Sequence, residues 1–215
     1  MKSLLIKELK LTAHPLTFFF LAFSVMALIP GYPILVGSFF VCFGIFQSFQ
    51  QGREAHDVLY TVLLPIRKRD AVRARFLLVC FIEAIALLLM AILTAVRMTA
   101  LSEAKVYTTN FMMNANLVYL AYTLLVFALF NATFVGPFFK TAYKFGKPFI
   151  VFVITSFVLI CIAETLHHLP GLGFLNGVGR LGVQAAILAA AAVIFAAATG
   201  LSCSRAEKEF ETIDL

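Results

Sequence analysis

Long apolar stretches separated by short polar segments run through the whole chain. Within each stretch the apolar residues follow one another without the alternation typical of half-buried strands, so helices are predicted. A helix needs about 20 apolar residues to cross the hydrocarbon core of a bilayer. Four stretches meet this requirement and are predicted to span a membrane: Phe76–Val96, Asn114–Val135, Pro148–Leu166 and Leu181–Leu201.

The first apolar region, Pro15–Gln50, is too long for a single crossing. Pro30-Gly31-Tyr32-Pro33 interrupts it, and proline cannot continue the backbone hydrogen bonds of a helix. We therefore predict two crossings, Pro15–Ile29 and Tyr32–Phe49, joined by a tight turn. The expected fold class is an all-α integral membrane protein with six transmembrane helices. Its single transmembrane domain, residues 1–215, has an N-terminal interfacial helix (1–14), spans one and two (15–50), a coupling loop (51–75), spans three to six (76–201) and a tail (202–215).

Composition supports a membrane protein, since 62% of residues are hydrophobic and 13% are charged. A soluble domain is about half apolar and about a quarter charged. The net charge of +6 does not indicate nucleic-acid binding, because the basic residues form short clusters between apolar stretches. The four cysteines lie within or at the ends of these stretches without metal-ligand spacing, so neither a disulfide framework nor a metal site is predicted.

The positions of the charges predict the orientation in the membrane. With six crossings, 14 of the 17 Lys and Arg residues lie on the side of the termini, and only Arg97, Lys105 and Arg180 lie on the other side. Cytoplasmic loops carry an excess of Lys and Arg. We therefore expect a multi-pass protein of the cell membrane with both termini in the cytoplasm.

The loop between spans two and three contains an amphipathic segment, Glu54–Leu64. At about 100° per residue it forms a helix too polar to span the membrane, which lies on the bilayer surface or docks into a partner. Pro65 ends this helix, and a basic cluster up to Arg75 follows, where lipid phosphates are expected to bind. Asp70 suits the positive end of the next helix dipole. The apolar face consists of Ala55, Val58, Leu59, Val62 and Leu63, and the polar face of Glu54, Asp57 and Thr61.

Three features resemble the small six-span permeases of type-2 (ABC-2 type) ATP-driven exporters. These are the N-terminal MKSLLIKELK, the loop ending in LLPIRKRDAVRARF, and the six-span hydropathy that covers nearly the whole chain. The chain departs from this family at Arg67, where Ser or Thr more often caps the next helix. The departure concerns where the third span begins.

The resemblance implies that Glu54–Leu64 is a coupling helix seated in a cleft of a cytoplasmic ATPase subunit, which binds the ATP and Mg²⁺. It also implies a homodimer or a heterodimer with a sister permease. A surface helix that rests on lipid is the alternative. The residues expected to dock onto the ATPase are Glu54, Asp57, Val58, Leu59, Thr61, Val62, Leu63, Leu64 and Pro65.

Three polar residues are predicted within or at the ends of spans: Glu83, Asn131 and Glu164. A charge at the bilayer centre costs about 2.5–3.5 kcal/mol on insertion scales, so Glu83 is expected to face the bundle interior, water or a partner, or else to be protonated. Its role is left open between a pathway residue and an internal hydrogen-bond anchor. The neighbouring His167 and His168 cannot face the same way on a helix, which argues against a metal site.

No Walker-type motif occurs, so ATP hydrolysis is expected in a separate chain. The predicted function is a permease that exports an amphipathic or apolar cargo, such as a peptide, drug or lipid. One rival is a non-transporting membrane accessory, such as an immunity or sensor partner. A second rival, an intramembrane enzyme, requires clustered catalytic side chains at one depth, and the sequence has no such cluster.

Overall fold

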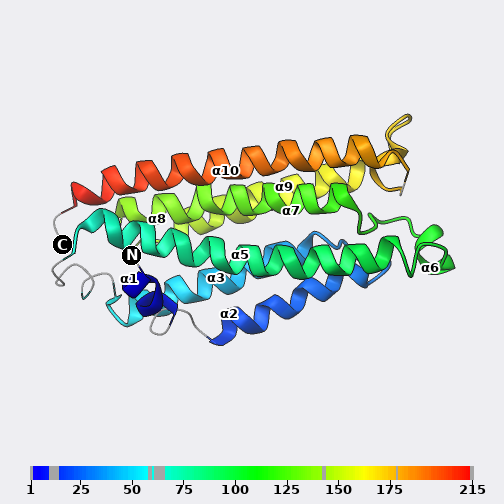
Figure 1. The fold of residues 1–215 in the computed structure, drawn as a ribbon. Helices are drawn as coiled ribbons and strands as arrows, with labels where there is room; N and C mark the ends of the chain where they lie inside the picture. The colour runs from blue at the N-terminus through cyan, green and yellow to red at the C-terminus, as the bar shows by residue number, and fades with distance from the viewer. Residues whose placement is uncertain are drawn as a thin grey trace.

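The computed structural model describes residues 2–9, 15–57, 60, 66–141, 144–177 and 179–213. These residues form helices and turns, and no strand occurs among them. Figure 1 shows the long helices side by side in one elongated bundle, with both chain termini at the same end. The predicted all-helical fold class is confirmed.

The described residues form both short and long helices. The first half contains α1 (Lys2–Lys7), α2 (Pro15–Phe20), the 3₁₀-helix η2 (Leu21–Leu28), α3 (Val36–Glu54), α5 (Lys68–Met98) and α6 (Lys105–Thr108). The second half contains α7 (Leu117–Phe130), the π-helix η3 (Asn131–Val135), α8 (Gly136–Thr141), α9 (Gly146–Leu166), the 3₁₀-helix η4 (Gly173–Leu175) and α10 (Leu181–Glu211).

Among the described residues, four helices are long and apolar enough to cross a membrane: α5, the continuous helix Leu117–Thr141, α9 and α10. They correspond to the four long stretches predicted from the sequence. The first apolar region forms the shorter apolar helix Pro15–Leu28 and α3, whose last two turns are rich in glutamine. Length and hydropathy therefore identify four spans, and the count of six depends on this first helical pair.

The helix Pro15–Leu28 packs closely along α3. The Thr17 hydroxyl donates a 2.7 Å hydrogen bond to the carbonyl of Gly44 and lies 2.6 Å from the hydroxyl of Ser48. A Cβ atom on Gly44 would lie 2.5 Å from Cβ of Phe20, so glycine is required where the two helices touch. The two segments thus form a tight hairpin.

The predicted turn at Pro30–Pro33 joins these two segments. Gly31 has φ +75°, a conformation that glycine adopts without strain. The amide oxygen of Asn110 accepts a 3.2 Å hydrogen bond from the Gly31 backbone, and the Tyr107 hydroxyl donates to the Leu28 carbonyl over 2.8 Å. The segment after α5 therefore fixes this turn at the end of the bundle away from the termini.

Phenylalanine rings fill the core between α3, η3, α8 and α9. Phe134 is fully buried, and the rings of Phe46 and Phe149 stack with centroids 3.8 Å apart. The rings within 6.3 Å of Phe134, measured between centroids, belong to Phe46, Phe49, Phe130, Phe138 and Phe149. Much of the high phenylalanine content therefore serves packing inside the chain.

Candidate functional site

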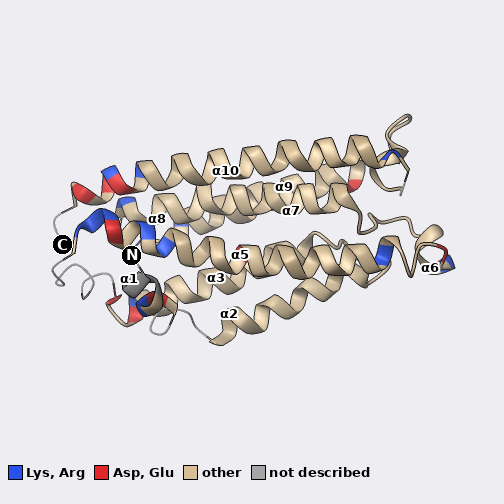
Figure 2. Cartoon of the chain, viewed as in Figure 1, with Lys and Arg blue, Asp and Glu red and all other residues tan. Residues whose placement is uncertain are grey.

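The end of the bundle that holds both termini is rich in charge, and is called the charged end below. Figure 2 shows Lys, Arg, Asp and Glu gathered there, with few at the opposite end. Two helices reach beyond their predicted spans to form it, because α5 begins at Lys68, before Phe76, and α10 continues past Leu201 to Glu211. The expected loop and tail are thus partly helical.

Ion pairs join these two extensions. Arg73 makes two hydrogen bonds to the carboxylate of Glu207, at 2.7 and 3.0 Å, and Arg69 lies 2.5 Å from Glu211. Lys68 donates a 2.7 Å hydrogen bond to the backbone carbonyl of residue 213. The basic cluster was expected to meet lipid phosphates, but these three side chains are occupied by the end of α10.

The ion pairs between α5 and α10 change the pKa of the two glutamates. Hydrogen bonds from Arg73 and Arg69 lower the pKa of Glu207 and Glu211, respectively. A lowered pKa in the folded state stabilises the fold above the unfolded pKa, and this contribution is lost as the pH falls through the folded value. The pairing of α5 with α10 is therefore fully present at neutral pH and weakens only on acidification.

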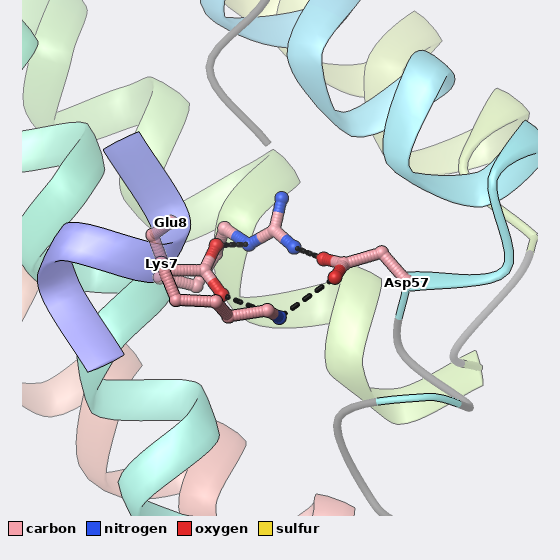
Figure 3. A network of polar contacts seen from close by, with 4 residues as sticks. Lys7, Glu8 and Asp57 are labelled. Carbon is pink, nitrogen blue, oxygen red and sulfur yellow. Dashed lines mark hydrogen bonds and ion pairs between the residues drawn. The ribbon is translucent and has the colours of Figure 1, made fainter. Parts of the chain in front are cut away.

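A second set of charges forms a closed ring, called the ion ring below, made by Lys7, Glu8, Asp57 and Arg75 (Figure 3, where the first three are labelled). Lys7 Nζ lies 3.2 Å from Glu8 and 2.7 Å from Asp57. Arg75 Nε lies 2.9 Å from Glu8, and its Nη2 lies 2.5 Å from Asp57. Two positive and two negative charges thus neutralise one another.

The ion ring is largely removed from solvent. The side chains of Arg75 and Glu8 are 7% and 3% exposed, and that of Asp57 is 12% exposed. The Arg75 guanidinium also lies 5.2 Å from the centre of the Phe49 ring, so an aromatic face of α3 covers it. Buried charges require this kind of full pairing, because an isolated one is very costly.

Three segments distant in sequence meet in the ion ring. Lys7 is the last residue of α1, Glu8 follows it directly, and Arg75 lies near the start of α5. Asp57 follows a turn at Ala55–His56, where His56 has φ 51°. The ring therefore fixes the beginning of the predicted coupling segment to both α1 and α5.

The predicted docking residues are placed only in part. Glu54 is the last residue of α3, and the turn at Ala55–His56 separates it from Asp57, so the helix expected from Glu54 is interrupted there. Tyr60 is helical and 64% exposed. The remaining predicted docking residues, Val58, Leu59, Thr61, Val62, Leu63, Leu64 and Pro65, lie outside the described residues.

A separate polar cluster lies inside the bundle. Asn131 Nδ2 donates hydrogen bonds to Glu83 Oε2 and Thr199 Oγ1, both over 3.1 Å, and the Ser202 hydroxyl donates to the Asn131 carbonyl over 2.7 Å. Glu83 and Asn131 are 1% and 0% exposed. These contacts join α5, η3 and α10. The helix continues through the π turn and Gly136-Pro137 to Thr141, beyond the predicted end of the fourth span at Val135.

Glu164 lies apart from this cluster, at the opposite end from the termini. Its carboxylate accepts a 3.0 Å hydrogen bond from the Met113 backbone. His167 is buried against the carbonyl of Phe111, and the His168 ring stacks on the Phe111 ring with centroids 4.2 Å apart. Within the described part of the chain, no three His, Cys, Asp or Glu side chains form a group that fits a metal ion.

Sequence reasoning missed the roles of Lys7, Glu8 and Arg75. Glu8 is the only acidic residue in a basic N-terminus, and Asp57 is one of two acids in the coupling segment. An acidic residue among basic ones indicates that ion pairs form, but it does not identify the partners. Lys7 and Asp57, for example, are 50 residues apart in the sequence.

The chain was compared with known protein families, curated proteins and solved structures. A family model described as ABC-2 family transporter protein matches residues 3–206. No curated protein and no solved structure matches the chain.

Proposed function

Because the chain belongs to the ABC-2 family of transporter proteins, we propose that it forms the membrane part of an ATP-driven exporter whose charged end faces the cytoplasm. Membership makes the chain a multi-pass membrane permease that works with ABC ATPase subunits and is not itself the ATPase. The direction of transport, the cargo and the docking surface are the proposed parts. ATP and Mg²⁺ bind to the ATPase subunits.

The proposed orientation and the six crossings rest on charge and length. Basic residues gather at the charged end, as expected on the cytoplasmic side of the cell membrane. A 3₁₀-helix rises about 2.0 Å per residue and an α-helix about 1.5 Å, so Pro15–Leu28 extends over about 25 Å and α3 over about 28 Å. Both lengths approach the hydrocarbon thickness of about 30 Å.

The observation that carries the proposed coupling is the ion ring. Asp57 lies near the start of the proposed docking segment, and it is held to α1 and α5 by buried ion pairs. A displacement of the segment by the ATPase would thus move α5 with it, as packed elements move together in rigid-body transitions. The Glu83–Asn131 contact and the pairing of α5 with α10 would pass this movement to α10.

The proposed transporter contains two copies of this chain, or this chain and a sister permease, because six helices form half of a typical pathway. The proposed cargo is amphipathic or apolar. Glu83 is the only acidic or basic residue between Phe76 and Val96. In the predicted spans Asn114–Val135 and Pro148–Leu166, the only acidic or basic residue is Glu164, near the end of the second. Such helices offer little to recognise a strongly charged cargo.

The docking proposal is tested by the double substitution Leu59→Asp, Leu63→Asp on the apolar face of the segment. We expect the ATPase subunit, co-expressed with the permease, to be lost from the purified complex, because two carboxylates would have to enter an apolar cleft. The matched control, Thr61→Asp, adds a charge to the polar face and is expected to retain the ATPase. Retention by the double variant would contradict docking through this face. If the wild-type chain captures no ATPase, it acts as an accessory instead.

A further inference from the structure

A groove of about 400 Å³ opens on the surface between α8 and α10 near the charged end. Its wall is made of small and apolar residues, including Gly136, Ala198 and Leu201. Lys140, Arg205 and Glu209 line it as well and supply its charges. The groove is thus apolar along one part and charged along the other, which lies toward the C-terminal end of α10.

Small residues create this groove. A Cβ atom on Gly136 would overlap the hydroxyl of Ser202, so α8 and α10 touch at this point. On either side of the contact the helices carry alanines, which leave the space between their backbones unfilled. The groove therefore follows from the close approach of two helices.

The basic residues of the groove differ from those of the α5 extension in having little internal pairing. No carboxylate of the described residues lies within ion-pair distance of Arg205, which is exposed. Lys140 is 68% exposed and lies 3.8 Å from Glu209, a loose contact. By contrast, Arg73 and Arg75 are held by carboxylates at 2.5–2.9 Å. The groove thus offers a net positive charge to an external anion.

The position of the groove matches the boundary between hydrocarbon and water. Arg205 lies one turn beyond Leu201, where the apolar part of α10 ends. Basic pockets between helices at the cytoplasmic membrane surface bind the headgroups of anionic lipids. An acyl chain can then lie along the apolar part while the phosphate meets Arg205.

We propose that the groove between α8 and α10 binds an anionic phospholipid, with its phosphate between Lys140 and Arg205 and an acyl chain against Ala198 and Leu201. A second copy of the chain fits less well. A two-fold interface places each patch against itself, and Arg205 would then approach its own copy. The proposal requires the charged end to lie at the membrane surface, and it is independent of cargo and of ATPase docking.

The test measures lipid retained by the full-length purified protein, using phosphatidylglycerol and phosphatidylcholine as probes in native mass spectrometry. We expect the wild type to retain phosphatidylglycerol in preference. The variant Lys140→Gln, Arg205→Gln should bind it more weakly, by roughly fivefold for each basic side chain removed and about 25-fold for both. The control Lys144→Gln, Lys147→Gln removes two lysines at the same end that do not line the groove, and should behave as wild type.

A second variant, Ala198→Phe, fills the apolar part without changing the charge and should also release the lipid. Circular dichroism and size-exclusion chromatography identify the variants that remain folded. Equal retention by the groove variant and the control would overturn the proposal, as would retention by folded Ala198→Phe. A change of oligomeric state in the groove variants with unchanged lipid would assign this face to a second copy and would also overturn it.

Discussion

Replacing Arg75 with glutamine is expected to destabilise the protein by about 3–5 kcal/mol, the cost of breaking a buried ion pair by removing one partner. The substitution removes one of the two cations of the ion ring, so that Lys7 is the ring's remaining cation beside the two carboxylates of Glu8 and Asp57. Thermal unfolding of the purified protein in detergent measures the effect. The control Arg69→Gln removes an arginine of the same helix whose side chain is 51% exposed, and it should change stability little.

A double variant separates the structural role of the ion ring from its proposed role in coupling. Glu8→Gln combined with Arg75→Gln restores the charge balance and leaves the pair of Lys7 and Asp57, so it should be more stable than Arg75→Gln alone. It still lacks the link from Asp57 to α5. We therefore expect ATP hydrolysis by the bound ATPase to continue while transport per ATP falls. An Arg75→Gln variant as stable as Arg69→Gln would contradict the account of the ion ring.

Substitutions of Glu83 distinguish the anchor from the pathway role that the sequence left open. Glu83→Leu is expected to cost about 1–3 kcal/mol, because the Asn131 amide loses a buried acceptor. Glu83→Gln should retain stability and transport. Its carbonyl can accept the hydrogen bond from Asn131, and its amide can donate to Asn131 Oδ1, which has no partner among the described residues.

Unfolding in detergent and cargo transport are both measured for the Glu83 variants. Glu164→Gln serves as the control at the opposite end of the bundle. A Glu83→Gln protein that is fully stable but inactive in transport would show that the carboxyl group itself is needed. That result would assign Glu83 to the pathway and contradict the anchor.

Hydropathy predicts the parts of this fold that lie in lipid and says little about the parts that lie in water. The four long apolar stretches and the turn at Pro30–Pro33 were predicted, because lipid demands continuous apolar helices and proline interrupts them. The helical extension beyond Leu201 was not predicted, and the one at Lys68–Arg75 was predicted only through Asp70 near its start, because polar residues there are helical through pairing with each other. Hydropathy predicts only the part of a helix that lies in lipid, whereas ion pairs stabilise the polar start of α5 and the polar end of α10.

At the start of α5, an acidic residue in the first turn compensates for the absence of a capping side chain. Arg67 occupies the N-cap position, where its side chain makes no capping hydrogen bond. Asp70 lies in the first turn, as predicted, and offsets part of the helix dipole. The missing Ser or Thr therefore does not prevent the helix from beginning at Lys68.

The candidate site was harder to predict than the fold. The docking segment around Leu59, which stays a prediction, was proposed from its amphipathic pattern, which is local in sequence. The ion ring depends on contacts between α1, the coupling segment and α5, and no periodicity connects segments so far apart. The contact between Glu83 and Asn131 was not predicted either, although each residue was identified by its polarity within an apolar stretch.

Membrane sidedness of Tyr60 tests the central claim most directly. Tyr60, three residues after Asp57 of the ion ring, is 64% exposed, and Val106, 60% exposed in α6, marks the opposite end. Tyr60→Cys and Val106→Cys are made separately in a chain whose four native cysteines are replaced by alanine, and each is treated with a membrane-impermeant maleimide. The account predicts labelling of Tyr60→Cys only in inside-out vesicles and of Val106→Cys only in intact cells. Labelling of Tyr60→Cys in intact cells would contradict it.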